Sequence, residues 1–162
     1  MTTPRIDIDI PTQRLALLDA RGAQVARYAI SSAANGVGEV MDSFCTPRGR
    51  HIIRAKIGRG APRGSVFVAR RWSGERFGPG SRAAHPKRDW ILTRILWLSG
   101  CEVGFNRLGR VDSMRRFIYI HGAPDDVPMG QPGSRGCIRM TCRDVIDLFD
   151  RVAPGTPVHI HE

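Results

Sequence analysis

The chain has 162 residues, of which 41% are hydrophobic. This share is enough for one packed core, so we expect a single domain over residues 1–162 and exclude disorder along the whole chain. The 25 basic residues outnumber 15 acidic ones, giving a net charge of +10, and only Lys56 and Lys87 are lysines, so the excess is arginine. Guanidinium groups suit carboxylates and phosphates, which favours an acidic ligand or polymer; codon bias in a GC-rich genome explains the same excess about as well.

No stretch approaches the ~20 apolar residues that a membrane-spanning helix needs. The most apolar run, Trp90–Leu98, is interrupted by Arg94. The N-terminal segment carries Asp7 and Asp9 and lacks the apolar core of a secretory signal. With Met1 as the native start, we expect a cytoplasmic protein, and export to the periplasm is the alternative.

The four cysteines form no C-x-x-C pair and no regular framework, so disulfides are not expected and a reducing compartment fits. They are Cys45, Cys101, Cys137 and Cys142. We expect all but Cys137 to be small buried side chains.

The first half of the chain has the pattern of β-strands. Isoleucines alternate with aspartates over residues 6–10, which predicts a strand with one buried face. A turn ending at Gly22 separates Arg14–Leu18 from Gln24–Ser31, which predicts a hairpin with a positive φ at the glycine. Further strands are expected at His51–Ile57, after a turn over residues 46–49, and at Ser65–Ala69.

The middle of the chain combines an irregular segment with one buried strand. Residues 74–87 are rich in glycine, proline, serine and arginine, which predicts an exposed loop that could cover a cleft. The run Arg116–His121 is apolar, β-branched and aromatic, which predicts a buried strand whose last side chain, His121, emerges at the end of the sheet.

The C-terminal segment predicts a helix and a final strand. Thr141–Asp144 has the form of a capping box, and Val145, Leu148, Phe149 and Val152 follow at helical spacing. Residues 154–157 end the helix, and the alternation over Val158–His161 returns the chain to the sheet.

The chemically informative segment is His121–Gly122 followed by Gly133–Met140, which reads GSRGCIRM. A thiol is a strong nucleophile as thiolate, which requires a base or a positive field beside it. Cys137 lies 16 positions after His121, has Arg135 and Arg139 nearby in sequence, and is expected just before a helix start. A Cys/His dyad is therefore the hypothesis.

The glycine before the cysteine has a separate use. Gly136 lets the backbone turn sharply and point its N–H groups into the reaction centre, where they would hold an oxyanion. The candidate donors are the N–H groups of Arg135, Gly136 and Cys137.

The pattern His-Gly, a glycine-containing loop and then Ser-x-Gly-Cys-Ile-Arg-Met resembles the active-site signature of the YkuD-like L,D-transpeptidase catalytic domain. The opening hairpin, the turn over residues 46–49, Trp90–Leu98, Asn106–Asp112 and the closing helix and strand also resemble proteobacterial-type members. The resemblance implies a mainly β fold, a small barrel-like or sandwiched sheet with a few short helices. It also implies cysteine-dependent acyl transfer without a cofactor or metal.

Carried over residue by residue, the resemblance makes Cys137 the nucleophile and His121 the general base, with the carbonyl of Gly122 orienting the imidazole. Ser134 and Gly136 match positions that shape the turn. Two positions depart from the family pattern. Arg135 stands where many members have a second histidine, and Ala123 stands where threonine is frequent, so the roles of those side chains do not transfer.

The implied substrate is a peptidoglycan stem tetrapeptide or muropeptide, attacked at the L-centre of its third residue with release of D-alanine. Water as acceptor makes the enzyme an L,D-carboxypeptidase of muropeptide recycling, which is the leading hypothesis; an amine of a neighbouring stem makes it a periplasmic L,D-transpeptidase. Arg135 and Arg139 are expected near a substrate carboxylate, although Arg139 bracing the loop is an equal alternative. The oligomeric state is not predicted.

The remaining candidates have weaker support. A noncatalytic binder of an acidic polymer, including nucleic acid, is a remote alternative, because the aromatic residues are not interleaved with basic runs. His159 and His161 share a strand face, yet no ligand at the usual spacing accompanies them, so zinc is not expected. His51 and His85 are predicted to be surface groups, and Trp90, Trp97 and Leu98 to belong to the core.

Overall fold

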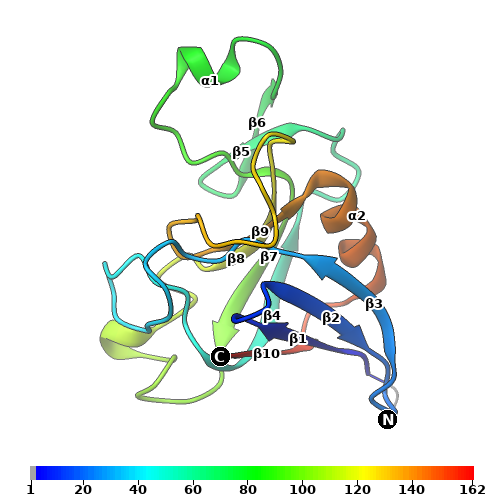
Figure 1. Cartoon of the computed structure of the whole chain (residues 1–162), viewed down its shortest axis with the longest axis vertical. Helices are drawn as coiled ribbons and strands as arrows, with labels where there is room; N and C mark the ends of the chain where they lie inside the picture. Colours follow the sequence, from blue (N-terminus) through cyan, green and yellow to red (C-terminus); the bar gives the residue numbers. More distant parts are fainter. Residues whose placement is uncertain (1–2) are drawn as a thin grey trace.

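A strongly curled sheet dominates the computed structural model, which describes residues 3–162 (Figure 1). Its strands within that range are β1 (Arg5–Asp9), β2 (Arg14–Leu18), β3 (Gln24–Ala29), β4 (Gly49–Ile57), β5 (Ser65–Val68), β6 (Arg71–Arg76), β7 (Leu92–Gly100), β8 (Tyr119–Ala123), β9 (Ile138–Thr141) and β10 (Pro157–His161). The helices are α1 (Ser81–Ala84), α2 (Cys142–Arg151) and a 3₁₀ turn at Gly109–Val111. The predicted mainly β fold with a few short helices is confirmed.

The strand order is β3-β2-β1-β10-β4-β7-β5-β6, and β8 branches from β7 to pair with β9. The first and last strands lie side by side, because β1 pairs in parallel with β10 in the register Ile6↔Val158 and Ile8↔Ile160. All four of these side chains are buried, so the alternation seen at each end of the sequence serves one shared core. The predicted hairpin of β2 and β3 is confirmed, with a φ of 85° at Gly22.

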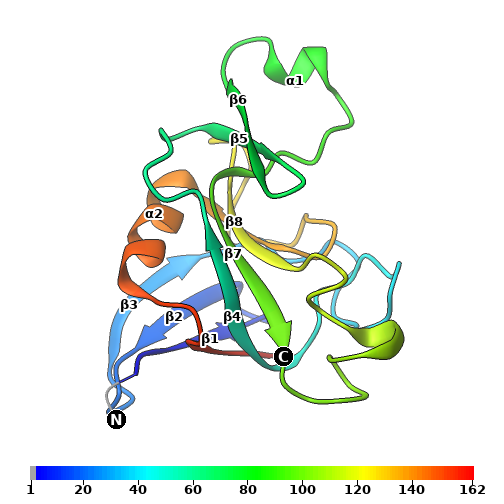
Figure 2. The same cartoon turned by 180° about the vertical axis from the view of Figure 1, so that it is seen from behind.

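The helix α2 packs against the curled sheet and contacts β7, β8 and β9 (Figures 1 and 2). Its apolar face buries Val145, Leu148 and Phe149. The hydroxyl of Thr141 accepts a hydrogen bond from the N–H of Asp144 at 3.1 Å, so the predicted N-cap is confirmed. Among residues 3–162 no helix has the length and apolar character needed to cross a bilayer.

Two predictions about the active-site segment were wrong in detail. The strand expected from Arg116 begins only at Tyr119, because the preceding residues form a turn in which Phe117 has a φ of 57°. No helix follows Cys137; residues 138–141 form β9, which pairs in parallel with β8. Ile138 is fully buried there and completes the core, so tertiary packing decides for a strand.

The hairpin of β5 and β6, together with α1, stands above the rest of the sheet (Figures 1 and 2). The loop predicted over residues 74–87 is therefore too long, since β6 extends to Arg76 and α1 occupies part of the remainder. Every residue of β6 is exposed, so its pairing with β5 leaves no apolar periodicity in the sequence.

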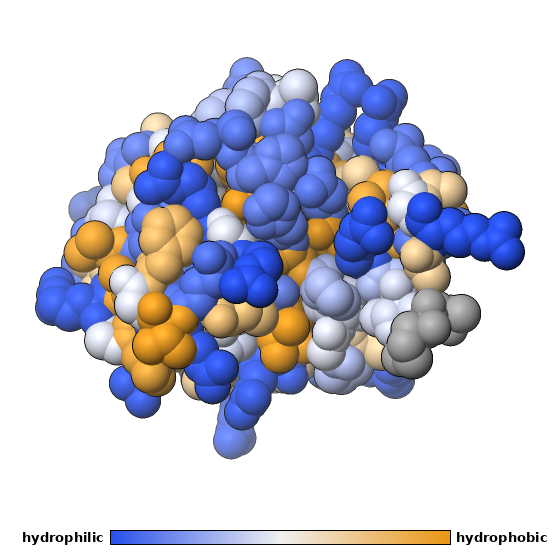
Figure 3. All heavy atoms as spheres, turned by 90° about the horizontal axis from the view of Figure 1, so that it is seen from below, coloured by the Kyte–Doolittle hydropathy of each residue, from blue (hydrophilic) through white to orange (hydrophobic). Residues whose placement is uncertain are grey.

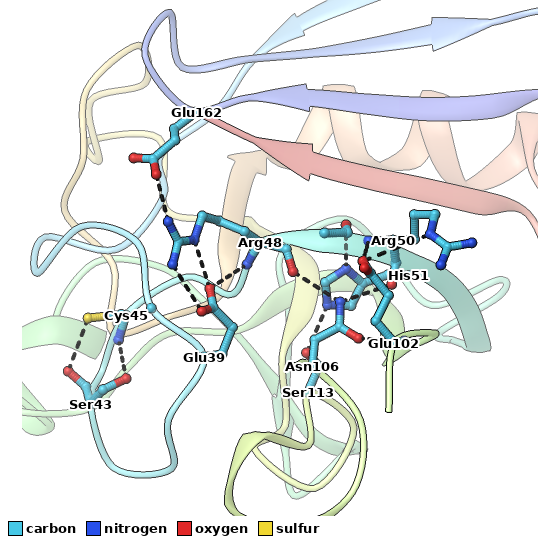
Figure 4. A network of polar contacts seen from close by, with 12 residues as sticks. Glu39, Ser43, Cys45, Arg48, Arg50, His51, Glu102, Asn106, Ser113 and Glu162 are labelled. Atoms are coloured by element: carbon cyan, nitrogen blue, oxygen red, sulfur yellow. Dashed lines mark hydrogen bonds and ion pairs between the residues drawn. The ribbon is translucent and has the colours of Figure 1, made fainter. Parts of the chain in front are cut away.

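A polar network ties β4 to residues 102–113 (Figure 4). The amide of Asn106 donates to the carbonyl groups of Arg48 and Arg50, at 3.0 Å each. His51 Nε2 lies 2.8 Å from Ser113 Oγ, and His51 is only 1% exposed. The prediction of a surface His51 was wrong, because its side chain faces this network beneath the sheet.

A salt-bridge cluster extends the network toward the C-terminus (Figure 4). Arg48 pairs with Glu39 at 2.9 Å and with Glu162 at 2.7 Å. Seen from below, the molecular surface is mainly polar, and its apolar patches are broken by polar side chains (Figure 3).

Candidate active site

His121 lies at the centre of β8, between β7 on one side and β9 on the other, rather than at the end of the strand. The imidazole is fully buried, and its Nδ1 lies 2.7 Å from the carbonyl oxygen of Gly122. A carbonyl only accepts hydrogen bonds, so this contact assigns the ring proton to Nδ1 and leaves Nε2 as the basic nitrogen. Among residues 3–162, Nε2 has no hydrogen-bond partner.

The residue after the histidine must be glycine for steric reasons. A Cβ on Gly122 would lie 2.6 Å from the carbonyl oxygen of Leu92 and 3.2 Å from Cys142 Sγ. The close approach of β7 and α2 therefore sets the position of the carbonyl that holds the imidazole.

Cys137 lies one residue before β9, beside β8. Because Ile120 pairs with Ile138 and His121 with Arg139, continuing the register sets Cys137 beside Tyr119. Residues two apart on a strand project from one face, so the thiol and the imidazole share a face of the β8–β9 pair.

The thiol of Cys137 forms hydrogen bonds with main-chain groups and not with the imidazole. Sγ donates to the carbonyl oxygen of Phe117 and accepts from the N–H of Tyr119, at 3.3 Å each. Neither residue stands out in the sequence, since these contacts are made by main-chain atoms at the turn that precedes β8.

Hydrogen bonds on both sides shape the turn before the nucleophile. Ser134 Oγ donates to the carbonyl oxygen of Cys137 at 2.6 Å and accepts from the N–H of Gly136 at 3.2 Å. Gly136 has a φ of 133°, and its carbonyl oxygen accepts from Thr46 Oγ1 at 2.9 Å. The role of Thr46 was missed, because it comes from a turn 90 positions away along the chain.

Of the three expected oxyanion donors, the N–H of Gly136 is already engaged by Ser134. Within the described part of the chain, the N–H groups of Arg135 and Cys137 donate to no protein acceptor. Two donors flanking the turn are thus free to bind a developing negative charge.

The two arginines of the signature have different surroundings. Arg135 is exposed and its Nη2 donates to the carbonyl oxygen of Lys87 at 3.0 Å, which ties the turn to the loop after α1. Arg139 is half-buried and its Nη2 donates to Ser31 Oγ at 2.9 Å. Through this hydrogen bond Arg139 braces the segment that contains Ser31.

A cavity of about 220 Å³ lies between this loop and the turn. Asp89 and Trp90 line it on one side, and Ser134, Arg135 and Arg139 on the other. Asp89 was not singled out from the sequence, where it has no distinguishing pattern.

Burial governs the protonation of the two central groups. It lowers the pKa of His121 below its usual value, an effect that the carboxylate of Asp89 opposes. It raises the pKa of Cys137 to about 12, and the N–H of Tyr119 and the guanidinium of Arg139 oppose that shift. At neutral pH the site therefore holds a neutral thiol and a neutral imidazole.

The remaining cysteines and histidines lie outside this site. Cys142 is buried as expected, whereas Cys101 is exposed and Cys45 only half-buried, because both fall in surface loops; for these two the prediction was wrong. Trp90 and Leu98 are buried in the core as predicted, Trp97 is half-buried, and His85 is exposed.

The pairing of β1 with β10 places a carboxylate beside His159 and His161. Asp7 of β1 lies 2.8 Å from His161 Nε2 and 3.8 Å from His159 Nδ1, a neighbour that sequence spacing did not reveal. Over residues 3–162, no cluster of three or more His, Cys, Asp or Glu side chains has an arrangement able to hold a metal ion.

The sequence profile of the YkuD family, described as the L,D-transpeptidase catalytic domain, matches residues 3–160. The chain belongs to this family. A comparison with curated protein sequences gave no match.

Solved structures of L,D-transpeptidases share the fold. The Mycobacterium smegmatis L,D-transpeptidase has a TM-score of 0.58 at 17% identity, covering 99% of this chain and 59% of its own. L,D-transpeptidase 3 from Mycobacterium tuberculosis has a TM-score of 0.61 at 16% identity, with 99% and 62% covered. The enzyme from Xylanimonas cellulosilytica has a TM-score of 0.55 at 18% identity, with 99% and 61% covered. The chain thus spans about three fifths of the length of these L,D-transpeptidases.

Proposed function

We propose that the chain is a cysteine acyltransferase of peptidoglycan stem tetrapeptides, acting on the carbonyl at the L-centre of the third residue. The observation that carries this proposal is that half-buried Cys137 shares a face of the β8–β9 pair with buried His121, whose Nε2 has no hydrogen-bond partner within residues 3–162. Membership of the L,D-transpeptidase catalytic domain family supports cysteine acyl transfer on peptidoglycan.

In the first half-reaction, rotation of the thiol away from Phe117 brings Sγ toward His121 Nε2, which takes the proton as Sγ attacks the carbonyl carbon. The N–H groups of Arg135 and Cys137 bind the resulting oxyanion. Collapse of this intermediate breaks the C–N bond, and the imidazolium returns its proton to the nitrogen of the departing D-alanine. The product is a thioester on Cys137.

In the second half-reaction, His121 Nε2 removes a proton from the acceptor as the acceptor attacks the thioester carbon. The C–S bond breaks, and the imidazolium returns the proton to the sulfur, which regenerates the thiol. We propose water as the principal acceptor, which makes the chain an L,D-carboxypeptidase. The structurally similar proteins from Mycobacterium and Xylanimonas are L,D-transpeptidases, which favours an amine as the alternative acceptor.

Incubation of the purified protein with a tetrapeptide stem, with and without an amine acceptor, tests both readings by mass spectrometry. A tripeptide alone indicates hydrolysis, and a crosslinked dimer indicates transfer. Cys137→Ala abolishes turnover and the acyl-enzyme mass, whereas the matched control Cys101→Ala, at an exposed cysteine outside the site, retains both. Intact affinity for an acidic polymer with no turnover by the unmodified protein would instead support the noncatalytic binder.

A further inference from the structure

The turn between β5 and β6 has a strained backbone. Ala69 has a φ of 48° and Arg70 a φ of 63°, both in the left-handed region. Two-residue hairpin turns of this kind usually contain Asn-Gly or Asp-Gly, because a Cβ makes the conformation unfavourable. Residues with such strained backbone conformations are often found at ligand sites, where a side chain must be held in one place.

The side chain of Arg70 is fixed by three aromatic residues. Its Cζ lies 4.7 Å from the ring centroid of Trp97 and 4.8 Å from that of Phe117. Its Nη1 donates to the hydroxyl of Tyr119 at 3.0 Å. Two ring contacts and a hydrogen bond hold the planar group in one orientation, so little entropy remains to be lost on binding.

This guanidinium has no carboxylate partner within residues 3–162, although other arginines of the chain form salt bridges. It is half-buried and keeps part of its surface open. A preorganised, unpaired guanidinium is suited to a planar anion that it can contact through two N–H groups.

Two of the three residues that fix Arg70 also hold the nucleophile. Cys137 Sγ accepts from the N–H of Tyr119 and donates to the carbonyl oxygen of Phe117. A path of one tyrosine residue and two hydrogen bonds, of 3.0 and 3.3 Å, therefore joins the guanidinium to the sulfur. An extended peptide spans roughly 3.5 Å per residue, so a few residues cover such a path.

We infer that Arg70 is a specificity-determining residue that binds a carboxylate of the stem peptide, a few residues from the carbonyl that Cys137 attacks. The inference rests on the proposed function, since it takes the stem peptide as substrate. Arg70 contacts neither reacting atom; it selects and places the peptide.

The test compares Arg70→Gln with Arg71→Gln, which removes a neighbouring, exposed arginine of the same hairpin. Each enzyme receives the tetrapeptide and a set of tetrapeptides in which one carboxylate at a time is converted to an amide. With the unmodified tetrapeptide, we expect Arg70→Gln to raise KM about 10- to 100-fold and to change kcat by less than about threefold. Arg71→Gln keeps the unmodified values.

Amidation of the carboxylate that Arg70 binds raises KM for the unmodified enzyme by a similar factor and leaves KM for Arg70→Gln unchanged. The amide that gives this pattern identifies the carboxylate. Because two substrates are compared on one enzyme, a loss of folded protein lowers both rates alike and does not imitate the result. Equal sensitivity of the two enzymes to every amidation overturns the inference, whereas absence of turnover by the unmodified enzyme overturns the proposed function.

Discussion

The main-chain N–H of Tyr119 donates a hydrogen bond to Cys137 Sγ at 3.3 Å. This contact holds the sulfur beside β8 as a neutral thiol, with its own proton directed to the carbonyl oxygen of Phe117. The nucleophile is thus held by main-chain atoms, on the same face of the β8–β9 pair as His121. Such a thiol is protected from adventitious alkylation and becomes reactive when a substrate displaces the Phe117 contact.

The pH dependence of Cys137 alkylation follows from this arrangement. The pKa of the thiol is raised to about 12 by burial, so at pH 8 only about one molecule in ten thousand carries the thiolate. We expect the rate of iodoacetamide addition at Cys137 to rise continuously from pH 7 to pH 10, measured by peptide mass spectrometry. The exposed thiol of Cys101 is the internal control. A plateau for Cys137 already at pH 7 would contradict a neutral resting thiol.

Thr46 should matter for both stability and activity. Its hydroxyl donates to the carbonyl oxygen of Gly136 at 2.9 Å and accepts from the N–H of Ala33 at 3.0 Å, and the residue is fully buried. Thr46→Val leaves both backbone groups unpaired, so we expect a loss of about 1–3 kcal/mol in the free energy of unfolding, together with a lower kcat. Urea unfolding and turnover measure the two effects.

Thr46→Ser keeps the hydroxyl and serves as the matched control. It should retain kcat and lose only the contribution of one methyl group. If Thr46→Val and Thr46→Ser lose activity equally, the hydroxyl does not position the turn.

Gly136 is expected to tolerate no side chain. Its φ of 133° disfavours any residue with a Cβ, and the added atom would lie 3.3 Å from the carbonyl oxygen of Cys45. Gly136→Ala should cost about 1–3 kcal/mol of stability and lower kcat more than tenfold, because the oxyanion donors shift with the turn.

Gly60→Ala separates backbone strain from the effect on the site. Gly60 has a φ of 77°, but an added Cβ there meets nothing within 4 Å. This variant should lose about 1 kcal/mol and keep full activity. Loss of stability without loss of activity in Gly136→Ala as well would show that the turn does not set the oxyanion donors.

The sequence predicts those strands and helices that have one buried and one solvent-exposed face. The hairpin of β2 and β3 and the helix after Thr141 are of this kind, because the spacing of their apolar residues, the turn at Gly22 and the cap at Thr141 are local signals. The strand β6 escaped prediction because its backbone pairs with β5 while its side chains remain exposed. The strand β9 was mistaken for the start of a helix because its short apolar run gives no period.

The same division applies to the site. His121, Gly122 and Cys137 carry a motif, so local sequence was enough to propose them. Tyr119 acts on the sulfur through its main-chain N–H, which no residue type reveals, and Arg70 reaches the site from a distant hairpin. Contacts of these two kinds depend on the tertiary fold and have no signature along the chain.

His51 should make the protein less stable in mild acid. Burial lowers the pKa of this histidine to about 4, whereas the unfolded chain has the ordinary value of about 6.5. Between these values the unfolded state binds more protons than the native state, so stability is complete above about pH 6.5 and falls as the pH drops toward 4. The loss is at most about 3 kcal/mol.

Urea unfolding at pH values from 4 to 7 measures this dependence, and one variant resolves it. His51→Gln removes the His51 share of the slope and lowers stability at pH 7, since it breaks the hydrogen bond to Ser113. His121, whose pKa burial also lowers, contributes in the same window, so some slope remains. Carboxylates with lowered pKa, such as that of Glu39, add to the slope near and below their ordinary pKa of about 4.5, so the slope above about pH 5.5 reports the histidines. An unchanged slope in His51→Gln would mean that the pKa of this histidine is the same in the native and unfolded states, which contradicts the prediction.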